Sequence, residues 1–289
     1  MSKKSTGDIY QDITNRIIAE LENGVIPWQC SWHPPEWAHR NMISQKPYKG
    51  INRILLSLSR YSTPFWLSAR QIAKLHGSIR PHEIPTTVVF WKFFETTDDK
   101  KIPFMRMYSV YNLEQTTGIS PQNIPQLPVF HQLDFHPIEA AEQLLVQYTD
   151  CPKIVYDGNE ACYIPTRDII KMPPPKYFIS EEEFYGTLWH ECTHSSGAKH
   201  RLNRPGIQKV KFGSPEYARE ELIAEIGASY LCGHCGIENR TIKNSAAYIQ
   251  AWLERLRNDK KLIIQAAAQA ERAVRYITSP KNVSEELAA

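Results

Sequence analysis

The stretch His190-Glu191-Cys192-Thr193-His194 decides the fold of this chain, because it has the pattern H-E-x-x-H. On a helix, His190 and His194 lie one turn apart on one face, so both imidazoles can reach a single divalent metal. Glu191 lies beside them, where it can take a proton from an attacking water. An isolated pair of histidines is more often part of a surface or a core, so the weight of the motif depends on its surroundings.

The flanking residues predict the required helix. Ser180 can act as its N-cap, with Glu183 three positions on, and Gly197 supplies a stop. Apolar Phe184 and Leu188 recur at a helical interval between these signals. This context favours a site for metal-dependent hydrolysis over a chance match.

The third metal ligand has two alternatives, of which the first is His200. Gly197 and His200 extend the motif to H-E-x-x-H-x-x-G-x-x-H, which is the metzincin pattern. That pattern requires a methionine turn after the motif, whereas all 5 methionines precede it. His200 is therefore better interpreted as a residue that flanks the cleft.

The second alternative is a glutamate from a later helix. Ser214-Pro215 predicts the start of that helix, which continues to about Cys232. We favour Glu221 as the ligand, because Glu225 then lies one turn away and can accept the second ring N–H of a metal-bound histidine. Glu220 is the rival ligand, and a solvated run of charge is the interpretation without a metal.

The ligand set indicates the chemistry. Two histidine nitrogens and one carboxylate leave a position open, as catalytic zinc sites do, so Zn²⁺ is the expected cofactor, although Mn²⁺, Co²⁺ or Fe²⁺ also suits these donors. Such a metal polarises a scissile carbonyl, and Glu191 would act as general base and then pass the proton to the leaving amine. The candidates for stabilising the oxyanion are named only for their nearness in the chain: His200, Tyr177 and Tyr217.

The cysteines add no second site. Cys232-Gly233-His234-Cys235 has the spacing of disulfide oxidoreductases, but that chemistry needs the first cysteine at a helix N-terminus. Here the pair falls where the predicted Glu221 helix ends, so we interpret it as a helix end. The chain also begins without the apolar segment of a secretory signal and has no run of about 18 apolar residues. We therefore expect reduced thiols, a cytoplasmic location and no membrane partner.

Basic residues concentrate in the first part of the chain. Residues 1–125 hold 15 Lys and Arg and 10 Asp and Glu, whereas the remainder has a net charge of −2. Between residues 40 and 92 the only acidic residue is Glu83, and basic residues alternate with aromatic ones. This composition suits single-stranded nucleic acid, because aromatic rings stack on bases and cations attract phosphates. The alternative is that these aromatics belong to a core. The predicted DNA contacts are Arg40, Lys46, Tyr48, Lys49, Arg53, Arg70, Trp91 and Lys92.

The remaining patterns predict an α+β protein of two domains, residues 1–125 and 126–289, and 289 residues suffice for two cores. In the first domain we expect helices over 8–23 and 64–77, strands over 86–94 and 108–111, and a proline-rich linker over 119–128. In the second we expect a helix over 137–149, an edge strand over 161–173 and a long helical region over 243–277.

Several segments resemble the ArdC-type antirestriction proteins, in order over essentially the whole chain. In the first domain these are Tyr48-Lys49-Gly50-Ile51-Asn52, Trp66-Leu67-Ser68-Ala69-Arg70-Gln71, Val88-Val89-Phe90-Trp91-Lys92 and Val110-Tyr111-Asn112-Leu113-Glu114-Gln115-Thr116. In the second they are the regions His190–Arg204 and Glu220–Leu231, with Tyr248-Ile249-Gln250-Ala251-Trp252-Leu253.

The resemblance implies a plasmid-encoded bacterial protein that protects incoming DNA from host restriction during conjugation. It implies a domain that binds single-stranded DNA, followed by a zincin-like metallopeptidase domain of the gluzincin type. Related N-terminal domains occur in conjugative primases. Carried over by motif, the metal residues are His190, His194 and, in E-E-L-x-A-E, Glu221. The family commonly lacks a histidine at the place of His200.

Three hypotheses for the function follow. The favoured one is a DNA-binding metallopeptidase, whose protein substrate the sequence does not reveal. The second is a DNA-binding protein that shields DNA sterically, with a structural or vestigial metal site. The third is a mimic of DNA that occupies a restriction enzyme directly, and it ranks lowest because such mimics are strongly acidic whereas this chain has a net charge of +3.

Overall fold

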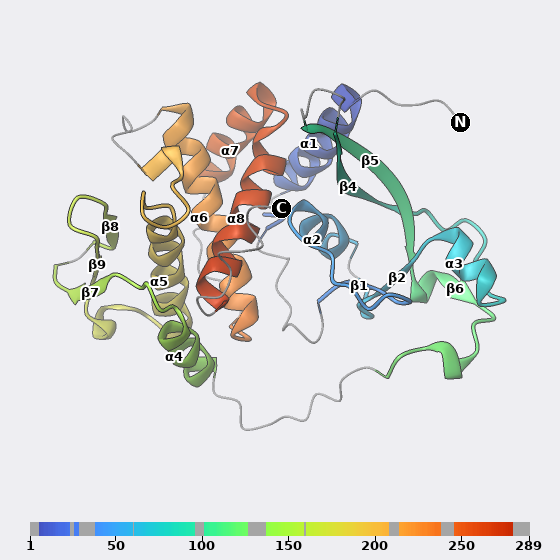
Figure 1. The fold of residues 1–289 in the computed structure, drawn as a ribbon, viewed down its shortest axis with the longest axis horizontal. Coiled ribbons are helices and arrows are strands. Elements are labelled where there is room, and N and C mark those ends of the chain that lie inside the picture. Colours follow the sequence, from blue (N-terminus) through green and yellow to red (C-terminus); the bar gives the residue numbers. More distant parts are fainter. Residues whose placement is uncertain are drawn as a thin grey trace.

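The computed structural model describes residues 6–23, 26–28, 38–59, 61–95, 101–126, 137–158, 160–207, 214–237 and 246–279. It shows an α+β protein in which an N-terminal half built around a sheet adjoins a mainly helical C-terminal half (Figure 1). None of the helices in these ranges combines the length and the hydropathy needed to cross a bilayer.

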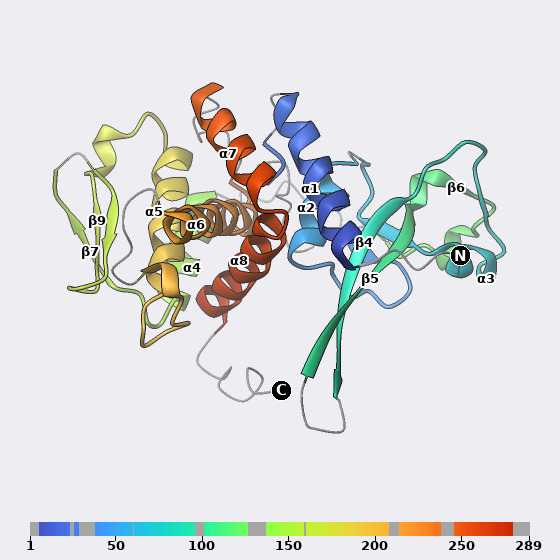
Figure 2. The same cartoon turned by 90° about the horizontal axis from the view of Figure 1, so that it is seen from above.

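The N-terminal half is organised around a four-stranded sheet of order β1-β2-β5-β4. Its helices and strands are α1 (Thr6–Glu22), β1 (Arg40–Asn41), α2 (Ile51–Ser57), β2 (Phe65–Leu67), α3 (Ala69–Lys74), β3 (Ser78–Ile79), β4 (Thr86–Glu95), β5 (Lys101–Asn112) and β6 (Thr116–Thr117). Strands β4 and β5 pair antiparallel from Thr86↔Val110 to Glu95↔Lys101 and extend beyond the helices as a ribbon (Figure 2).

One expected helix of this half is wrong in its first part. Residues 65–67 form strand β2, which pairs with β5 through Trp66 and Leu67, and only Ala69–Lys74 is helical. The side chain of Ser68 accepts a hydrogen bond from the Gln71 amide, and the Gln71 side chain accepts one from the Ser68 amide, so a capping box starts the helix anew. Burial of the Trp66 ring in the sheet overrides the local helical preference.

The C-terminal half packs its helices beside a three-stranded sheet of order β7-β9-β8. Its elements are α4 (Pro137–Gln147), β7 (Lys153–Tyr156), β8 (Cys162–Ile164), β9 (Ile169–Met172), α5 (Glu181–Ser196), α6 (Pro215–His234), α7 (Ala246–Asn258) and α8 (Leu262–Thr278). Helices α5, α6 and α8 lie at its centre, and the small sheet covers the side away from the N-terminal half (Figure 1).

Two expected elements of this half are each divided. The predicted strand over 161–173 is an antiparallel pair, β8 and β9, joined by a turn in which Asp168 has a φ of 49°. The predicted helical region over 243–277 is two helices, α7 and α8. The break lies at Asp259. Its side chain accepts a hydrogen bond from the Lys261 amide and forms an ion pair with Arg219. Strand β8 remains at the sheet edge, as expected for the segment.

The large hydrophobic core contains residues of both halves. Helix α1 lies along α7, and α2 lies beside α8 in both views (Figures 1 and 2). Trp28 packs edge-on against Trp252 at 6.0 Å. The two halves are therefore joined by apolar contacts as well as by the chain that connects them.

A polar contact at the start of α2 joins the two halves at the same junction. Gly50 donates its N–H to the buried carboxylate of Glu271 on α8, and its carbonyl accepts a hydrogen bond from Tyr230 on α6. Arg53 pairs with Glu271 at 3.5 Å and lies over the Tyr230 ring at 3.9 Å. A buried carboxylate with two partners in the other half holds the halves in register.

We expect Glu271→Ala to lower the free energy of unfolding by about 1–3 kcal/mol, because it leaves the Gly50 N–H and the Arg53 guanidinium without their acceptor. Urea denaturation of the full chain measures this. Glu254→Ala, an exposed glutamate on α7, is the matched control and should leave the midpoint in place. Equal midpoints for both variants would contradict a stabilising role of the junction.

Candidate metal centre

The two helices that carry the predicted site start where the sequence indicates. Ser180 accepts a hydrogen bond from the Glu183 amide at the start of α5, and Ser214 accepts one from the Tyr217 amide at the start of α6. The Glu183 carboxylate binds the amide of Ile179 and not that of the cap, so the full capping box is not formed. Both helices therefore begin at local signals.

The close approach of α5 and α6 depends on a glycine that spacing did not single out. A Cβ at Gly227 of α6 would meet the Thr193 Cγ2 atom of α5 at 2.5 Å. Thr193 is fully buried, and the small residues Ala224 and Ala228 of α6 are buried as well. The absence of a side chain at Gly227 lets the motif helix lie directly on the Glu221 helix.

The structure brings His190, His194 and Glu221 together. The Nε2 atoms of the two histidines are 3.1 Å apart, and the Glu221 oxygens lie 3.5 and 3.7 Å from them. Ligands about 2.05 Å from a tetrahedral metal are separated by roughly 3.4 Å, so these donors have the spacing of a metal cradle. Within the described ranges this is the cluster of histidine, cysteine and carboxylate groups that can hold an ion.

The charges of the site favour a cation between the rings. Burial alone would lower the pKa of His190, but the hydrogen bond to Glu221 and the charges of Glu225 and Glu191 outweigh it and raise that pKa to about 9. Burial raises the pKa of Glu221, yet His190 and His194 lower it to about 2. The carboxylates thus hold positive charge at the point where a metal would lie.

Glu220, the rival ligand, faces the other side of His194. Its Oε1 atom lies 3.3 Å from His194 Nδ1, the nitrogen directed away from the cradle. Burial raises the pKa of Glu220, but hydrogen bonds from His194 and Arg204 lower it below its ordinary value. Glu220 is therefore placed to orient the ring, whereas Glu225, the predicted partner of His190, lies 4.0 Å from its Nδ1.

Arg204 is a residue of the site that the motif analysis missed. Its guanidinium donates to Glu220 at 2.6 and 3.0 Å, to the Thr193 carbonyl and to the Ser196 hydroxyl. Both members of the Arg204–Glu220 pair are 4% exposed, so the pair is buried between α5, α6 and the loop that joins them. No spacing rule singles out an arginine in this loop.

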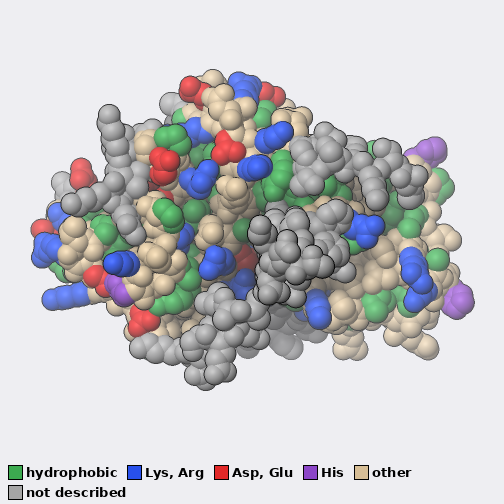
Figure 3. Space-filling view, turned by 45° about the horizontal axis from the view of Figure 1, so that its top comes forward, with side chains coloured by type: hydrophobic (Ala, Val, Ile, Leu, Met, Phe, Trp, Pro, Cys, Tyr) green, Lys and Arg blue, Asp and Glu red, His purple; other side chains and the backbone are tan. Residues whose placement is uncertain are grey.

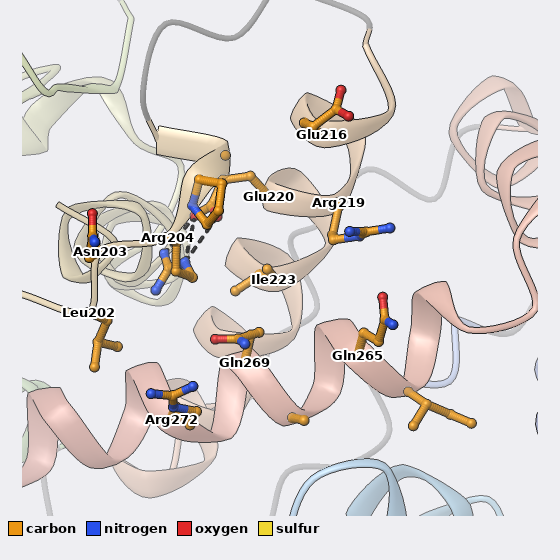
Figure 4. A pocket seen from close by; sticks show the side chains of 14 residues that line it. Leu202, Asn203, Arg204, Glu216, Arg219, Glu220, Ile223, Gln265, Gln269 and Arg272 are labelled. Atoms are coloured by element: carbon orange, nitrogen blue, oxygen red, sulfur yellow. Dashed lines mark hydrogen bonds and ion pairs between the residues drawn. The ribbon is translucent and has the colours of Figure 1, made fainter. Parts of the chain in front are cut away.

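Glu220 lines two pockets. Figure 4 looks into one of about 480 Å³, lined by residues of α6 and α8, where Arg204 points to Glu220. The other, of about 470 Å³, is lined by the three cradle residues together with Glu191, Tyr217 and strand β8. The metal cradle therefore opens on a cavity of its own.

Glu191 is fixed against strand β8. It is 7% exposed, and its Oε2 atom accepts a hydrogen bond of 2.7 Å from the Tyr163 amide. Both residues line the metal pocket. The carboxylate thus lies between the cradle and the exposed edge of the β7-β9-β8 sheet.

The candidates for stabilising an oxyanion lie at different distances from the cradle. Tyr217 lines the pocket and its hydroxyl is hydrogen-bonded to Glu221; burial first, and then the Glu221 charge, raise the pKa of Tyr217 to about 12. His200 pairs with Asp168 at 3.3 Å and is exposed. Tyr177 is also exposed and does not line the pocket. Of these three candidates, Tyr217 is therefore the residue that lines the metal pocket.

Cys232 and Cys235 lie at the end of α6, where Cys235 is the C-cap. Both thiols are free and fully buried, and burial raises the pKa of each. A buried, protonated thiol is a poor nucleophile, so this pair lacks the properties of a redox centre.

The predicted DNA contacts are divided between surface and interior. Lys46, Lys49 and Arg70 are exposed, and Tyr48 lies in a small core with Trp66. Arg53 is turned towards Glu271 and Tyr230, and the Arg40 guanidinium donates to the Ala38 carbonyl. The side chains of Trp91 and Lys92 lie outside the described part of the molecule.

Charge is unevenly spread over one face of the molecule. On the face drawn in Figure 3, most of the visible acidic side chains lie on the left and at the top, whereas the far right shows Lys, Arg and His side chains and no visible Asp or Glu. This agrees with the excess of basic residues in the first part of the sequence.

Fold and site together define a two-domain protein whose C-terminal domain is zincin-like. Residues 139–269 match the family model of a zincin-like metallopeptidase, and residues 7–127 match that of the N-terminal domain of anti-restriction factor ArdC. Two crystal structures of the antirestriction protein ArdC from plasmid R388, metal-free and Mn(II)-bound, superpose with TM-scores of 0.72 and 0.74. Each is 34% identical to this chain, and each match covers 93% of this chain and 96% of the ArdC chain. The chain belongs to the ArdC family of antirestriction proteins.

Two further relatives are similar over almost the whole chain. Protein y4eC of Sinorhizobium fredii is 34% identical and matches over 91% of this chain and 89% of its own length. A DNA primase TraC of Escherichia coli is 30% identical over 93% of this chain, which spans 20% of that primase. The same two-domain unit thus also occurs within a much longer protein.

We expect Glu221→Ala to abolish stoichiometric binding of Mn²⁺ or Zn²⁺, because it removes one of three donors. Glu220→Gln should weaken binding roughly ten- to hundredfold, since it removes the charge that orients His194 and pairs with Arg204 but keeps all three donors. Isothermal titration calorimetry on the full chain measures both. Glu216→Ala, an exposed glutamate in the first turn of α6, is the control and should bind as the wild type does. Intact binding by Glu221→Ala would place the third ligand elsewhere.

Proposed function

We propose that this antirestriction protein binds single-stranded DNA through its N-terminal domain and carries a metal-dependent peptidase site in its C-terminal domain. The observation that supports the second part is the cradle of His190, His194 and Glu221 with Glu191 beside it. The Mn(II)-bound structure of the relative supports a divalent metal, and Zn²⁺ suits the same donors. The domains we propose are residues 1–125 and 126–289.

The bound metal would polarise a scissile carbonyl and lower the pKa of water. Glu191 takes the proton of the attacking water and passes it to the leaving amine, and its hydrogen bond to the Tyr163 amide holds it in place for both steps. Tyr217 lines the pocket, where its hydroxyl can stabilise an oxyanion. Glu220 and Arg204 keep the His194 ring in one orientation.

Strand β8 gives the site a place for an extended peptide. It is the edge of its sheet, and residues Ala161, Cys162 and Tyr163 line the metal pocket. A peptide can add to such an edge through main-chain hydrogen bonds. We propose a protein substrate, such as a restriction enzyme or another DNA-bound protein, in the cytoplasm of the recipient bacterium.

Glu191→Gln should retain metal and DNA binding and lose hydrolysis and protection, because the amide cannot accept the proton of water. Protection is measured as the survival of unmodified plasmid DNA transferred by conjugation into a restricting host. Cys162→Ser, also in the pocket, is the control and should protect normally. Full protection by Glu191→Gln with metal still bound would instead support a steric shield.

The DNA part of the proposal rests on the exposed lysines of a domain rich in basic residues. Affinity for single-stranded DNA should fall steeply with salt, and the double variant Lys46→Ala/Lys49→Ala should reduce the slope of log K against log salt by about 1.4, at about 0.7 per phosphate contact. Fluorescence anisotropy on the full chain measures the slope. Lys153→Ala/Lys176→Ala, exposed lysines of the C-terminal half, should leave it unchanged. A slope that does not differ between the two double variants would refute this assignment.

A further inference from the structure

We propose that Phe90 and Tyr108 form a base-stacking platform on the β4–β5 ribbon, at which the chain holds the bases of single-stranded DNA. This inference rests on the proposed DNA binding and names the rings that contact the bases. Neither ring is among the DNA contacts that the sequence predicts.

The two rings are exposed side by side. Phe90 is 45% exposed and Tyr108 40% exposed, and their centroids are 5.3 Å apart with the planes at 80°. Single exposed apolar residues are ordinary on a protein surface, but adjacent aromatic rings expose a larger continuous apolar area. The pair thus presents ring surface to the solvent.

The ribbon places these rings next to a packed cluster. In the antiparallel register Phe90 lies opposite Arg106, and Val88 lies opposite Tyr108, so all four project from one face. Val88 is fully buried at the base of that face, in a small core with Tyr48 and Trp66. Tyr48 in turn packs against Phe90 at 6.1 Å. The platform is therefore the exposed end of a packed aromatic cluster.

Cations lie beside the rings. The Arg106 guanidinium is 5.8 Å from the centre of the Tyr108 ring and is exposed, and the exposed Lys46 and Lys49 flank Tyr48 in the chain. Among the residues whose side chains the structure describes, Glu83 accepts a hydrogen bond from Gln115 and Glu114 accepts hydrogen bonds from Ser62 and Thr63. Exposed rings with cations beside them match the base and the phosphate of one nucleotide chain.

This combination favours a single strand over other occupants. In a duplex the base faces are covered by their neighbours, so exposed rings would have no π-surface to contact. A second copy of the chain would bring the same basic residues together, which like charges oppose. The positive charge around the platform and its exposed rings therefore favour single-stranded DNA as the ligand.

The test is the affinity of the full chain for a fluorescein-labelled oligothymidylate at several salt concentrations. Phe90→Ala and Tyr108→Ala should each weaken binding roughly five- to hundredfold, the cost of losing one stacked base. The slope of log K against log salt should not change, because no phosphate contact is lost, whereas Arg106→Ala should reduce it by about 0.7. Ile84→Ala, which removes another exposed apolar residue of the same half, should bind as the wild type does.

Two further substitutions at Phe90 separate stacking from packing. Phe90→Leu keeps apolar bulk but has no π-face, so stacking predicts a loss like that of Phe90→Ala. Phe90→Trp should bind as tightly as the wild type or more tightly. If Phe90→Leu and Tyr108→Leu bind as the wild type does, the platform is overturned while DNA binding itself stands.

Other outcomes separate the platform from the function on which it rests. Failure of the wild-type chain to bind the oligonucleotide would remove the proposed DNA binding, and the platform with it. Equal losses for duplex and single strand would overturn stacking as the cause. If sedimentation shows that Phe90→Ala turns a dimer into a monomer with unchanged DNA affinity, the rings form a contact between copies and the platform is overturned.

Discussion

The buried ion pair between Arg204 and Glu220 is the interaction on which the metal centre depends. Arg204 binds the Thr193 carbonyl at the end of the motif helix and the Glu220 carboxylate on α6, so one guanidinium joins both helices to the loop between them. Glu220 in turn touches His194 on the nitrogen that faces away from the cradle. Removal of either charge would leave the other buried without its partner, which is strongly destabilising.

The same helix α6 connects the centre with the N-terminal half. Glu221 lies near its start and Tyr230 near its end, where the Tyr230 hydroxyl binds the Gly50 carbonyl and its ring lies beneath Arg53. Two residues before Gly50, Tyr48 supports the exposed Phe90 ring. Contacts of α6 and α2 thus connect the metal cradle with the neighbourhood of the proposed DNA surface, and the hydrophobic core shared by the two halves lies beside them.

Local signals were sufficient for much of the fold. The caps at Ser180 and Ser214 lie where spacing indicated, because a side-chain oxygen at a helix start binds an amide only three residues away. Predictions failed where distant pairing competed with local preference, as at Trp66, whose burial in the sheet turned an expected helix into a strand. The split of the segment 161–173 likewise depends on the turn at Asp168.

By itself, the sequence determined the H-E-x-x-H helix, a later helix rich in glutamate and a basic, aromatic first half, since each depends on residue type and short-range periodicity. Only the tertiary structure decided how α6 is turned against α5, which places Glu221 at both Nε2 atoms and Glu220 behind His194. It also turned Arg53 inwards and left Phe90 exposed. The orientation of α6 against α5 depends on contacts between residues far apart in the chain, such as the close approach of Gly227 and Thr193. No local sequence pattern specifies such contacts.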